Sequence, residues 1–298
     1  MKKIVLLIVG VGIIGVGLMS FQQSSFSKVN IHKEDSVNSK TINEIKISTS
    51  SADVEMIPTN GNEIYVLLTG KMTKDLEDKY ELEINQSNHT LKIDYIIKND
   101  SLGLKFGSFK DTKIQIKVPS KTFETIQVFT SSGDISIDEV KTKILAAKST
   151  SGDQSVSGTD IVKQLVLQSS SGNIDTNGNE TTSTDLHSTS GNIDINHLHS
   201  QKSVFETTSG NIRLKDERLQ GGMEFKSSSG DIDIHFQHSP ESFKVDFKGD
   251  SGEPNINIDG ILFKEKKENR AVGVKGTGEF EIKVTTGSGD LNIDESGN

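Results

Sequence analysis

A short motif at a nearly constant spacing constrains this chain more than any other feature. Its clearest copy runs from Ile126 to Ile137, where an alternating apolar segment leads into Ser-Ser-Gly-Asp and a second alternating segment follows. The glycines that mark successive copies are Gly133, Gly152, Gly172, Gly191, Gly210, Gly230, Gly252 and Gly289. The first five intervals between them are 19 or 20 residues, and a fixed period of this length is typical of stacked-repeat proteins.

Aligning the copies on their glycines places apolar residues in columns. The position five residues before the glycine is apolar in every copy: Val128, Ala147, Leu167, Leu186, Phe205, Phe225, Phe247 and Val284. The positions two and four residues after it are mostly apolar as well, with Gln154, Pro254 and Thr176 as exceptions. Because side chains at even offsets share one face of a strand, each copy predicts two short strands with one apolar face apiece.

One copy alone buries too few apolar side chains to offset the entropy lost in ordering it, so the copies must stack. Two arrangements meet this requirement, a β-solenoid of successive coils and an array of antiparallel hairpins, because Gly-Asp and Gly-Asn also suit hairpin turns. The constant register of the apolar columns favours the solenoid. We therefore expect an all-β protein with a β-solenoid of ~20-residue repeats over residues 121–298.

In either arrangement the Ser/Thr-Ser-Gly-Asp/Asn unit is expected to turn the chain. Glycine reaches positive φ without steric cost, Asp and Asn tolerate similar conformations, and hydroxyl groups satisfy the backbone of the turn. We therefore assign the motif glycines a structural role at turns. In a stack, the polar side chains of this unit are expected to form hydroxyl and amide ladders along one edge.

The segments that flank the regular copies show weaker versions of the same pattern. The stretch Ile45–Met56 fits the template with Ala52 in place of glycine, so we interpret it as a degenerate first copy. Alternating runs without the Ser-Gly unit follow it, and residues 41–120 are expected to form a lead-in region that caps the stack. Near the other end, the charged stretch Ile261–Lys275 is expected to form a protruding loop or hairpin.

Residues 1–21 begin with Lys2 and Lys3 and continue without charge from Ile4 to Phe21. This uncharged stretch is long enough to cross a bilayer as a helix. The lysines favour an orientation that places the rest of the chain outside the cytoplasm. We expect an uncleaved transmembrane helix, with a cleaved signal peptide as the alternative. Residues 22–40 are polar and aperiodic, which predicts a linker between the membrane and the folded part.

The composition excludes several classes of protein. The net charge of −9 argues against a nucleic-acid partner. The absence of cysteine excludes disulfides and thiolate zinc sites. Hydrophobic residues make up 32% of the chain, which is low for one large spherical core but adequate for the narrow core of a solenoid.

Several segments resemble a known family. Lys113–Pro119, the motif copy that starts at Ile126 with its serial Ser-Gly-Asp/Asn successors, and the closing segment Gly276–Leu291 are similar to the bacterial adhesin-like β-strand-repeat family. This family includes the LiaG-like proteins, which are encoded beside a cell-envelope stress-response system. The resemblance covers roughly residues 41–298. It implies a right-handed parallel β-solenoid outside the membrane and an association with the envelope, and it supplies no catalytic residues.

Acidic and amide residues after the glycines are the first candidates for chemistry, because parallel β-helices host polysaccharide-active enzymes that use paired acids. These positions recur in nearly every copy, which indicates turn residues rather than one active site. We therefore expect no enzyme activity. The pairs are Asp231/Asp233, Asn192/Asp194 and Asn173/Asp175.

Metal binding is the second candidate. Carboxylate columns bind calcium in some repeat proteins. Here the position three residues after the glycine, where the second acid of each pair would lie, varies from copy to copy, and an arginine at this position disfavours a cation. Its residues are Ser136, Ser155, Asp175, Asp194, Arg213 and Asp233. Five histidines fall within two or three copies: His187, His197, His199, His235 and His238. We expect His197 and His199 to share one face of a strand, as a weak metal site or, more commonly, as exposed structural histidines. We assign no metal and no cofactor, and leave calcium binding open.

These features together predict a non-catalytic protein of the cell membrane whose C-terminal domain lies outside the cytoplasm. It is expected to present a surface for envelope binding, adhesion or an envelope-stress interaction. The expected partners are the membrane, through the N-terminal helix, and either cell-wall glycan or an envelope-stress membrane protein. The alternatives are a polysaccharide-active β-helix enzyme and a passive structural spacer.

Overall fold

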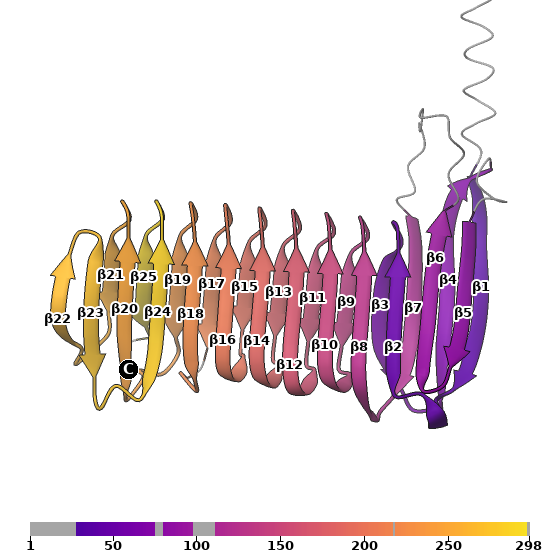
Figure 1. The fold of residues 1–298 in the computed structure, drawn as a ribbon, viewed down its shortest axis with the longest axis horizontal. Coiled ribbons are helices and arrows are strands. Elements are labelled where there is room, and N and C mark those ends of the chain that lie inside the picture. Colours follow the sequence, from indigo (N-terminus) through magenta and orange to yellow (C-terminus); the bar gives the residue numbers. More distant parts are fainter. Residues whose placement is uncertain (1–27, 75–79, 98–110, 217, 297–298) are drawn as a thin grey trace, which may run out of the picture.

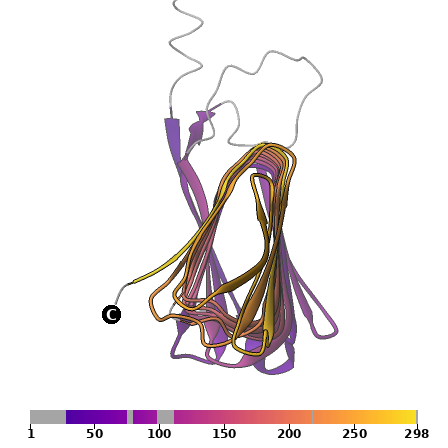
Figure 2. The same ribbon diagram turned by 90° about the vertical axis from the view of Figure 1, so that its left-hand side faces the viewer.

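The structure is a computed structural model that describes residues 28–74, 80–97, 111–216 and 218–296. These residues form an elongated stack of strands with two long faces (Figures 1 and 2). A 12-stranded sheet, here called sheet A, forms one face, and a 13-stranded sheet, sheet B, forms the other. No helix among the described residues is long and apolar enough to span a bilayer. The expected anchor, residues 1–21, lies outside them.

The regular copies form the middle of the stack, and each gives one long strand to sheet B and one short strand to sheet A. The long strands are β8 (Thr122–Thr130), β10 (Lys141–Ser149), β12 (Asp160–Ser169), β14 (Glu180–Ser188), β16 (His199–Thr207) and β18 (Gly222–Ser227). The short strands are β9 (Ile135–Asp138), β11 (Gln154–Ser157), β13 (Ile174–Asn177), β15 (Ile193–Asn196), β17 (Ile212–Asp216) and β19 (Ile232–Phe236).

Neighbouring copies pair in parallel, with equivalent residues opposite each other. Val128 lies opposite Ala147, which lies opposite Leu167. The same column is buried throughout, and further along it the ring centroids of Phe205 and Phe225 are 5.0 Å apart. This is the geometry of stacked coils. The prediction of an all-β solenoid is therefore confirmed, and the hairpin array is excluded for these copies.

The predicted degenerate copy is the first regular coil. It consists of β2 (Glu44–Thr49) and β3 (Asp53–Thr59), on which β8 and β9 pair directly. On its other side, β6 (Thr90–Ile97) and β7 (Asp111–Pro119) run parallel to β2 and β3. Antiparallel strands then end the sheets: β5 (Tyr80–Ser87) beyond β6, and β4 (Glu63–Thr73) and β1 (Lys28–Asn38) beyond β7. The lead-in region thus continues both sheets and covers this end of the core (Figure 1).

Part of the expected linker is folded. The strand β1 pairs with β4 over its whole length, and a 3₁₀ turn, η1 (Ser39–Thr41), joins it to β2. Within β1 only Ile31 is buried. The strand therefore lacks an apolar alternation, and the free backbone groups at the edge of β4 provide its pairing instead. The prediction of a linker over residues 22–40 was wrong from residue 28 onward, and residues 22–27 lie outside the described residues.

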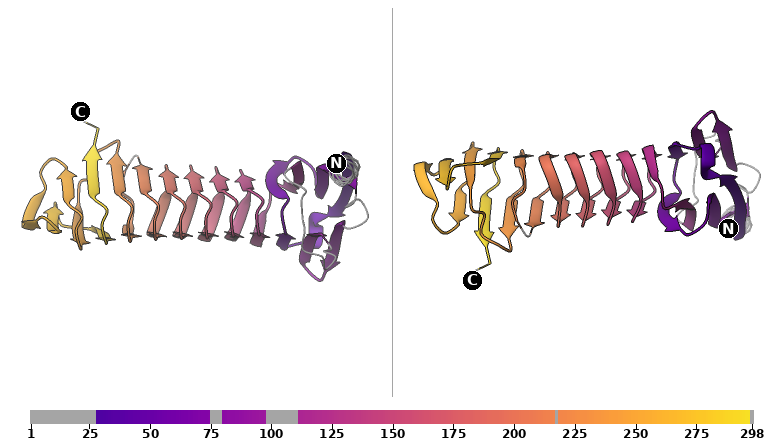
Figure 3. Two further views of the ribbon diagram at one scale, coloured as in Figure 1. Left: turned by 90° about the horizontal axis from the view of Figure 1, so that it is seen from above. Right: turned by 90° about the horizontal axis from the view of Figure 1, so that it is seen from below.

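The last copies do not stack in chain order. The Gly252 copy forms β20 (Phe243–Gly249) and β21 (Pro254–Asn257), and the Gly289 copy forms β24 (Phe280–Thr286) and β25 (Leu291–Glu295). In both sheets the Gly289 copy lies between the Gly230 and Gly252 copies. The charged insertion is a hairpin of β22 (Leu262–Lys267) and β23 (Arg270–Lys275) that ends sheet B. The chain therefore reaches the tip and turns back, so that β24 and β25 lie between strands made before them (Figures 1 and 3).

The motif glycines line up in one row, but not for the reason that we predicted. None of them has a positive φ. A Cβ atom at Gly191 would lie 2.0 Å from the carbonyl oxygen of Gly172, and one at Gly289 would lie 1.9 Å from that of Gly230. Glycine is needed because successive corners touch backbone to backbone. Ala52 is the first member of the row, so its methyl group meets no earlier corner among the described residues.

Positive φ angles occur at the opposite corner instead. There, Glu139, Gly158, Gly178 and His197 have φ between 51° and 63°. Each of these residues donates its backbone N–H to the next coil, as Gly158 does to the carbonyl of Asn177 at 2.9 Å. The left-handed conformation that the sequence suggested therefore exists, but half a coil away from the motif.

We expect Gly191→Ala to lower the free energy of unfolding by about 3 kcal/mol, because the overlap with the Gly172 carbonyl forces two coils apart. For comparison, Gly178→Ala is expected to cost about 1 kcal/mol, because its left-handed backbone is the only obstacle and no atom lies within 4 Å of the added Cβ. Urea denaturation of both variants measures the difference. Equal losses would contradict the close-approach explanation.

We expect removal of the last coil to loosen the tip of the stack. A chain that ends after Gly278 lacks β24 and β25, so β18 and β20 lose the strand with which both pair. Limited proteolysis should then cut between residues 237 and 275, while the earlier coils stay protected because each coil depends only on its neighbours. A chain that ends after Ser296 is the matched control. Unchanged resistance of the tip in the shorter chain would refute this expectation.

Candidate functional site

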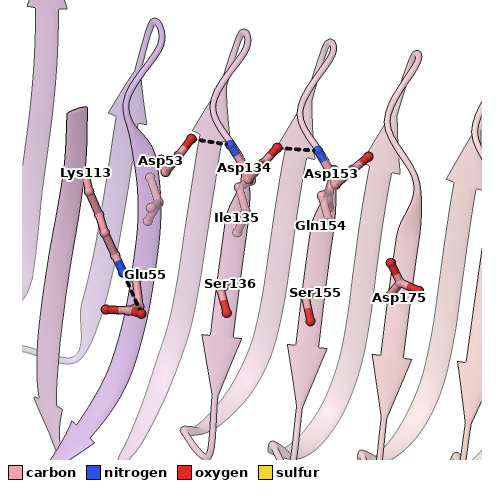
Figure 4. Close-up of a pocket in the computed structure, with 11 residues that line it drawn as sticks. Asp53, Glu55, Lys113, Asp134, Ile135, Ser136, Asp153, Gln154, Ser155 and Asp175 are labelled. Carbon is pink, nitrogen blue, oxygen red and sulfur yellow. Dashed lines mark hydrogen bonds and ion pairs between the residues drawn. The ribbon is translucent and has the colours of Figure 1, made fainter. Parts of the chain in front are cut away.

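A ladder of side chains joins the coils along the glycine corner. Asp53 Oδ1 accepts the backbone N–H of Asp134 at 2.9 Å, and Asp134 Oδ1 accepts that of Asp153 at 2.9 Å (Figure 4). The ladder ends where Asp290 Oδ1 accepts the N–H of Glu253 at 2.8 Å. Its intermediate members are Asn173, Asn192, Asn211 and Asp231. Each Asp or Asn in the row thus uses one oxygen to hold the next coil.

A second row, of buried hydroxyl groups, closes the same corner from inside. Ser188 Oγ accepts the N–H of Gly191 at 2.9 Å and donates to the carbonyl of Gly172 at 3.1 Å. Thr207 makes the same pair of bonds with Gly210 at 3.1 Å and Gly191 at 3.2 Å. The ladders expected from the sequence are therefore present. The hydroxyl group that makes these bonds lies three residues before the glycine. It is one position N-terminal to the Ser/Thr-Ser-Gly-Asp/Asn unit, whose hydroxyl groups we expected to satisfy the backbone of the turn.

Beside the ladder, the outer face of sheet A carries an open depression of about 290 Å³. Within it Lys113 Nζ lies 2.7 Å from Glu55 Oε1, and Gln115 donates to the other oxygen of this carboxylate. The bonds from Gln115 and Lys113 lower the pKa of Glu55. Among the residues that the structure describes, no other basic side chain lines the depression, and its remaining carboxylates belong to Asp53, Asp134, Asp153 and Asp175 (Figure 4).

The electrostatics of the depression follow from this excess of carboxylates. Burial raises the pKa of Asp175, and the negative charges of Asp194 and Asp153 raise it further. Burial also raises the pKa of Asp53, although the N–H of Asp134 that it accepts acts in the opposite direction. Bringing these groups together therefore opposes their ionisation.

The residues that line the depression supply charge but no nucleophile–base pair. Its hydroxyl groups belong to Ser136 and Ser155, and no histidine is among its lining residues. Ser136 Oγ donates to Asp138 at 2.9 Å, on the same short strand. Covalent catalysis also needs a base that is itself oriented by a third group, and the lining residues do not form this arrangement.

The family of the chain follows from a comparison of its sequence with known families. Residues 42–294 match the family described as Toastrack DUF4097. The chain belongs to this family. A comparison with curated proteins finds no match.

The fold of this Toastrack protein is similar to that of solved structures. A candidate adhesin from Bacteroides fragilis has a TM-score of 0.52 and 16% identity, over 90% of this chain and 98% of that one. A candidate adhesin from Parabacteroides distasonis has a TM-score of 0.47 and 15% identity, over 89% and 97%. A candidate lipid-binding protein from the same species has a TM-score of 0.47 and 18% identity, over 88% of this chain and 96% of that one. The family match, together with the fold shared with the Bacteroides fragilis protein, confirms the resemblance to an adhesin-like β-repeat family.

In this Toastrack protein the predicted acid pairs are largely engaged in the stack. Asp231 Oδ1 accepts the N–H of Asp290 at 2.9 Å. Arg213 lies between Asp194, at 3.5 Å, and Asp233, at 3.9 Å. The arginine that argued against a cation in this column thus pairs with the acids of the neighbouring coils. The amide partners of the other two pairs are members of the corner ladder. Of the residues in the three predicted pairs, Asp175 lines the depression.

The predicted histidine pair is not formed. His197 lies at the turn between β15 and β16 with a φ of 51°, whereas His199 begins β16. The prediction that both lie on one strand was wrong, because His197 occupies the positive-φ corner that follows β15. Elsewhere, His235 Nδ1 bonds to Asp294.

The remaining histidines are dispersed. His187 lies in β14, and His238 follows the end of β19. Within the described ranges, no group of three or more histidine or acidic residues could hold a metal ion.

The acidic depression was not identifiable from the sequence. It forms because β3 and β7 pair, which places Glu55 opposite Gln115 and Asp53 opposite Lys113. These residues are far apart in the chain and belong to two segments that share only an apolar alternation. Neither the spacing nor the residue types indicated that the segments would be neighbours.

We expect two aspartates to show opposite pH dependence. The raised pKa of Asp175 means that its ionisation destabilises the folded state, so Asp175→Asn should raise the free energy of unfolding at pH 7 by less than about 1 kcal/mol. The gain should vanish as the pH falls below the range in which the wild-type carboxyl ionises. Urea denaturation between pH 7 and pH 3 measures it.

Asp246 is the matched control, because the Arg270 side chain lowers its pKa. Asp246→Asn should therefore destabilise the protein at pH 7, and this loss should disappear as the pH falls through the lowered pKa. If both substitutions changed the free energy of unfolding in the same direction at pH 7, the charges around Asp175 would not act as described.

Proposed function

We propose that this Toastrack protein is a non-catalytic binding module of the cell envelope, anchored in the membrane and extended outside the cytoplasm. One observation carries the proposal. The recurrent polar groups, which are the most numerous candidates for chemistry in the sequence, hold the coils together through the corner ladder. This leaves the broad outer faces of the two sheets as the surface for recognition, and function resides in such sites rather than in the fold.

Three further points support the envelope setting. The Bacteroides fragilis protein with a similar fold is described as a candidate adhesin, and the resemblance to LiaG-like proteins favours a link to an envelope-stress pathway. The uncharged stretch after Lys2 and Lys3 supports the anchor. Since β1 starts at Lys28, residues 22–27 are the only connection, and six residues span at most about 20 Å. An anchor of this kind would hold the stack close to the membrane surface.

The proposal is tested with the full-length protein in detergent micelles. We expect saturable co-sedimentation with wall fragments of the organism that encodes it, or recovery of one membrane protein after crosslinking in intact cells. An unrelated acidic protein of similar pI is the control for non-specific binding. Failure of both experiments would leave the passive spacer as the better description.

The same wall fragments also test the enzyme alternative. Release of soluble sugar fragments that is lost in Asp231→Asn would reverse the proposal, because Asp231 was the foremost member of the predicted acid pairs. We expect no release by either the wild-type protein or the variant.

A further inference from the structure

A second hollow lies on the opposite face of the same coils as the acidic depression. It is a trough of about 360 Å³ on the outer face of sheet B, over β2, β8, β10 and β12. Among the residues that line it are Phe129, Ala146, Lys148, Val166 and Gln168. The acidic depression covers β3, β9, β11 and β13, which are the partner strands of these coils. The two hollows therefore lie on opposite sides of one segment of the stack.

The register of the strands explains the trough. In one outward row, Gln127, Ala146 and Val166 lie opposite one another. Alanine ends at a methyl group, so it leaves a gap between its longer neighbours. In the adjacent row, Phe129 lies opposite Lys148 and its side chain is 42% exposed. This ring plays no part in the core, which the inward column fills, and it stands beside the gap as an accessible apolar surface.

The charge of the trough is opposite to that of the chain. The chain has a net charge of −9, yet no carboxylate lines the trough and two lysines, Lys46 and Lys148, do. Lys148 forms no ion pair with any described residue. The Lys46 ammonium is 3.6 Å from Glu44, in a pair of side chains that are about 40% exposed, at 45% and 39%. Ion pairs this open to solvent contribute little, so both ammonium groups are available to an anionic ligand.

We propose that this trough binds a segment of an acidic polysaccharide, an inference that rests on the proposed function and assigns its ligand class and site. A linear polymer that lies along the stack meets a new set of outward side chains at each coil, about every 4.8 Å. Carboxylate groups of the polymer pair with Lys46 and Lys148, and its hydroxyl groups accept from the amides of Gln127 and Gln168. The exposed Phe129 ring offers a surface for the C–H face of a sugar.

An acyl chain fits the trough less well. Sites for apolar ligands bury most of the ligand surface, whereas this hollow is open along its length and has polar amides on its sides. The lysines also stand beside an apolar floor of small extent. The observations therefore favour a polar, anionic chain that passes over the surface rather than a lipid that is enclosed by it.

The first test measures binding of the full-length protein, in detergent micelles, to polygalacturonate and to its methyl ester, which has the same backbone without the charge. We expect binding to the acid form to be stronger and to weaken with added salt. Lys148→Gln should weaken it about tenfold or more. The matched control is Lys248→Gln, an exposed lysine in the same outward row at the far end of sheet B, and it should leave binding unchanged.

A second pair of variants tests the shape of the trough. Ala146→Glu fills the gap and places a negative charge in it, so it should abolish binding of the acid form. Thr285→Glu adds the same charge at an exposed position of β24 on the same face, and should have no effect. Both positions face outward, and equal unfolding midpoints in urea establish that each variant is folded.

The outcomes separate this inference from the proposed function. Equal effects of each variant and its control would overturn the assignment to the trough, even where wall fragments still bind. Binding to phosphatidylglycerol vesicles but not to polygalacturonate, with the same variant effects, would overturn the ligand class and indicate a lipid. Failure of polygalacturonate to bind would remove this inference, whereas the proposed function would fall only if wall fragments and crosslinking in intact cells also gave no partner.

Discussion

The close contact between successive glycine corners is the constraint on which the rest of the structure depends. Each motif glycine lies so near the preceding corner that a Cβ at Gly230 would sit 1.8 Å from the carbonyl oxygen of Gly210. This contact sets the register of the coils, and the register places the apolar columns over one another and lets each Asp or Asn reach the next N–H. The core, the corner ladder and the outward rows are therefore consequences of one repeated backbone contact.

Much of this could be predicted from the sequence, because each copy of the repeat carries the same apolar positions and the same glycine. The columns that begin with Val128 and Ile135 identified the inward faces, and the Ala52 copy was found as the first coil. The reason for the glycines was missed. A backbone with positive φ and a close contact between two backbones both select glycine, so the sequence alone does not distinguish them. The strand β1 was missed because an edge strand is held by backbone bonds and needs little apolar pattern.

The candidate sites were harder to predict than the fold. The acidic depression depends on which strands pair at the irregular end of the stack, and the sequence does not state that β3 meets β7. The trough is formed by outward-facing residues. It was not predicted because the aligned copies were interpreted through their inward apolar columns and their turn residues. A signal was nevertheless present: Phe129, Ala146 and Val166 are apolar residues at outward positions of neighbouring copies. Irregularities of the exposed rows in a repeat protein are thus as informative as the regularity of the buried ones.

Because the Gly289 copy lies between two copies that precede it in the chain, the coils at the tip cannot assemble in the order in which they are synthesised. Synthesis delivers the coils from the N-terminal end, so those up to β19 can assemble on the preceding ones as they appear. The Gly252 copy and the hairpin are made before the coil that supports them. They must wait until β24 and β25 have been made, so the tip is expected to be the last of these coils to assemble.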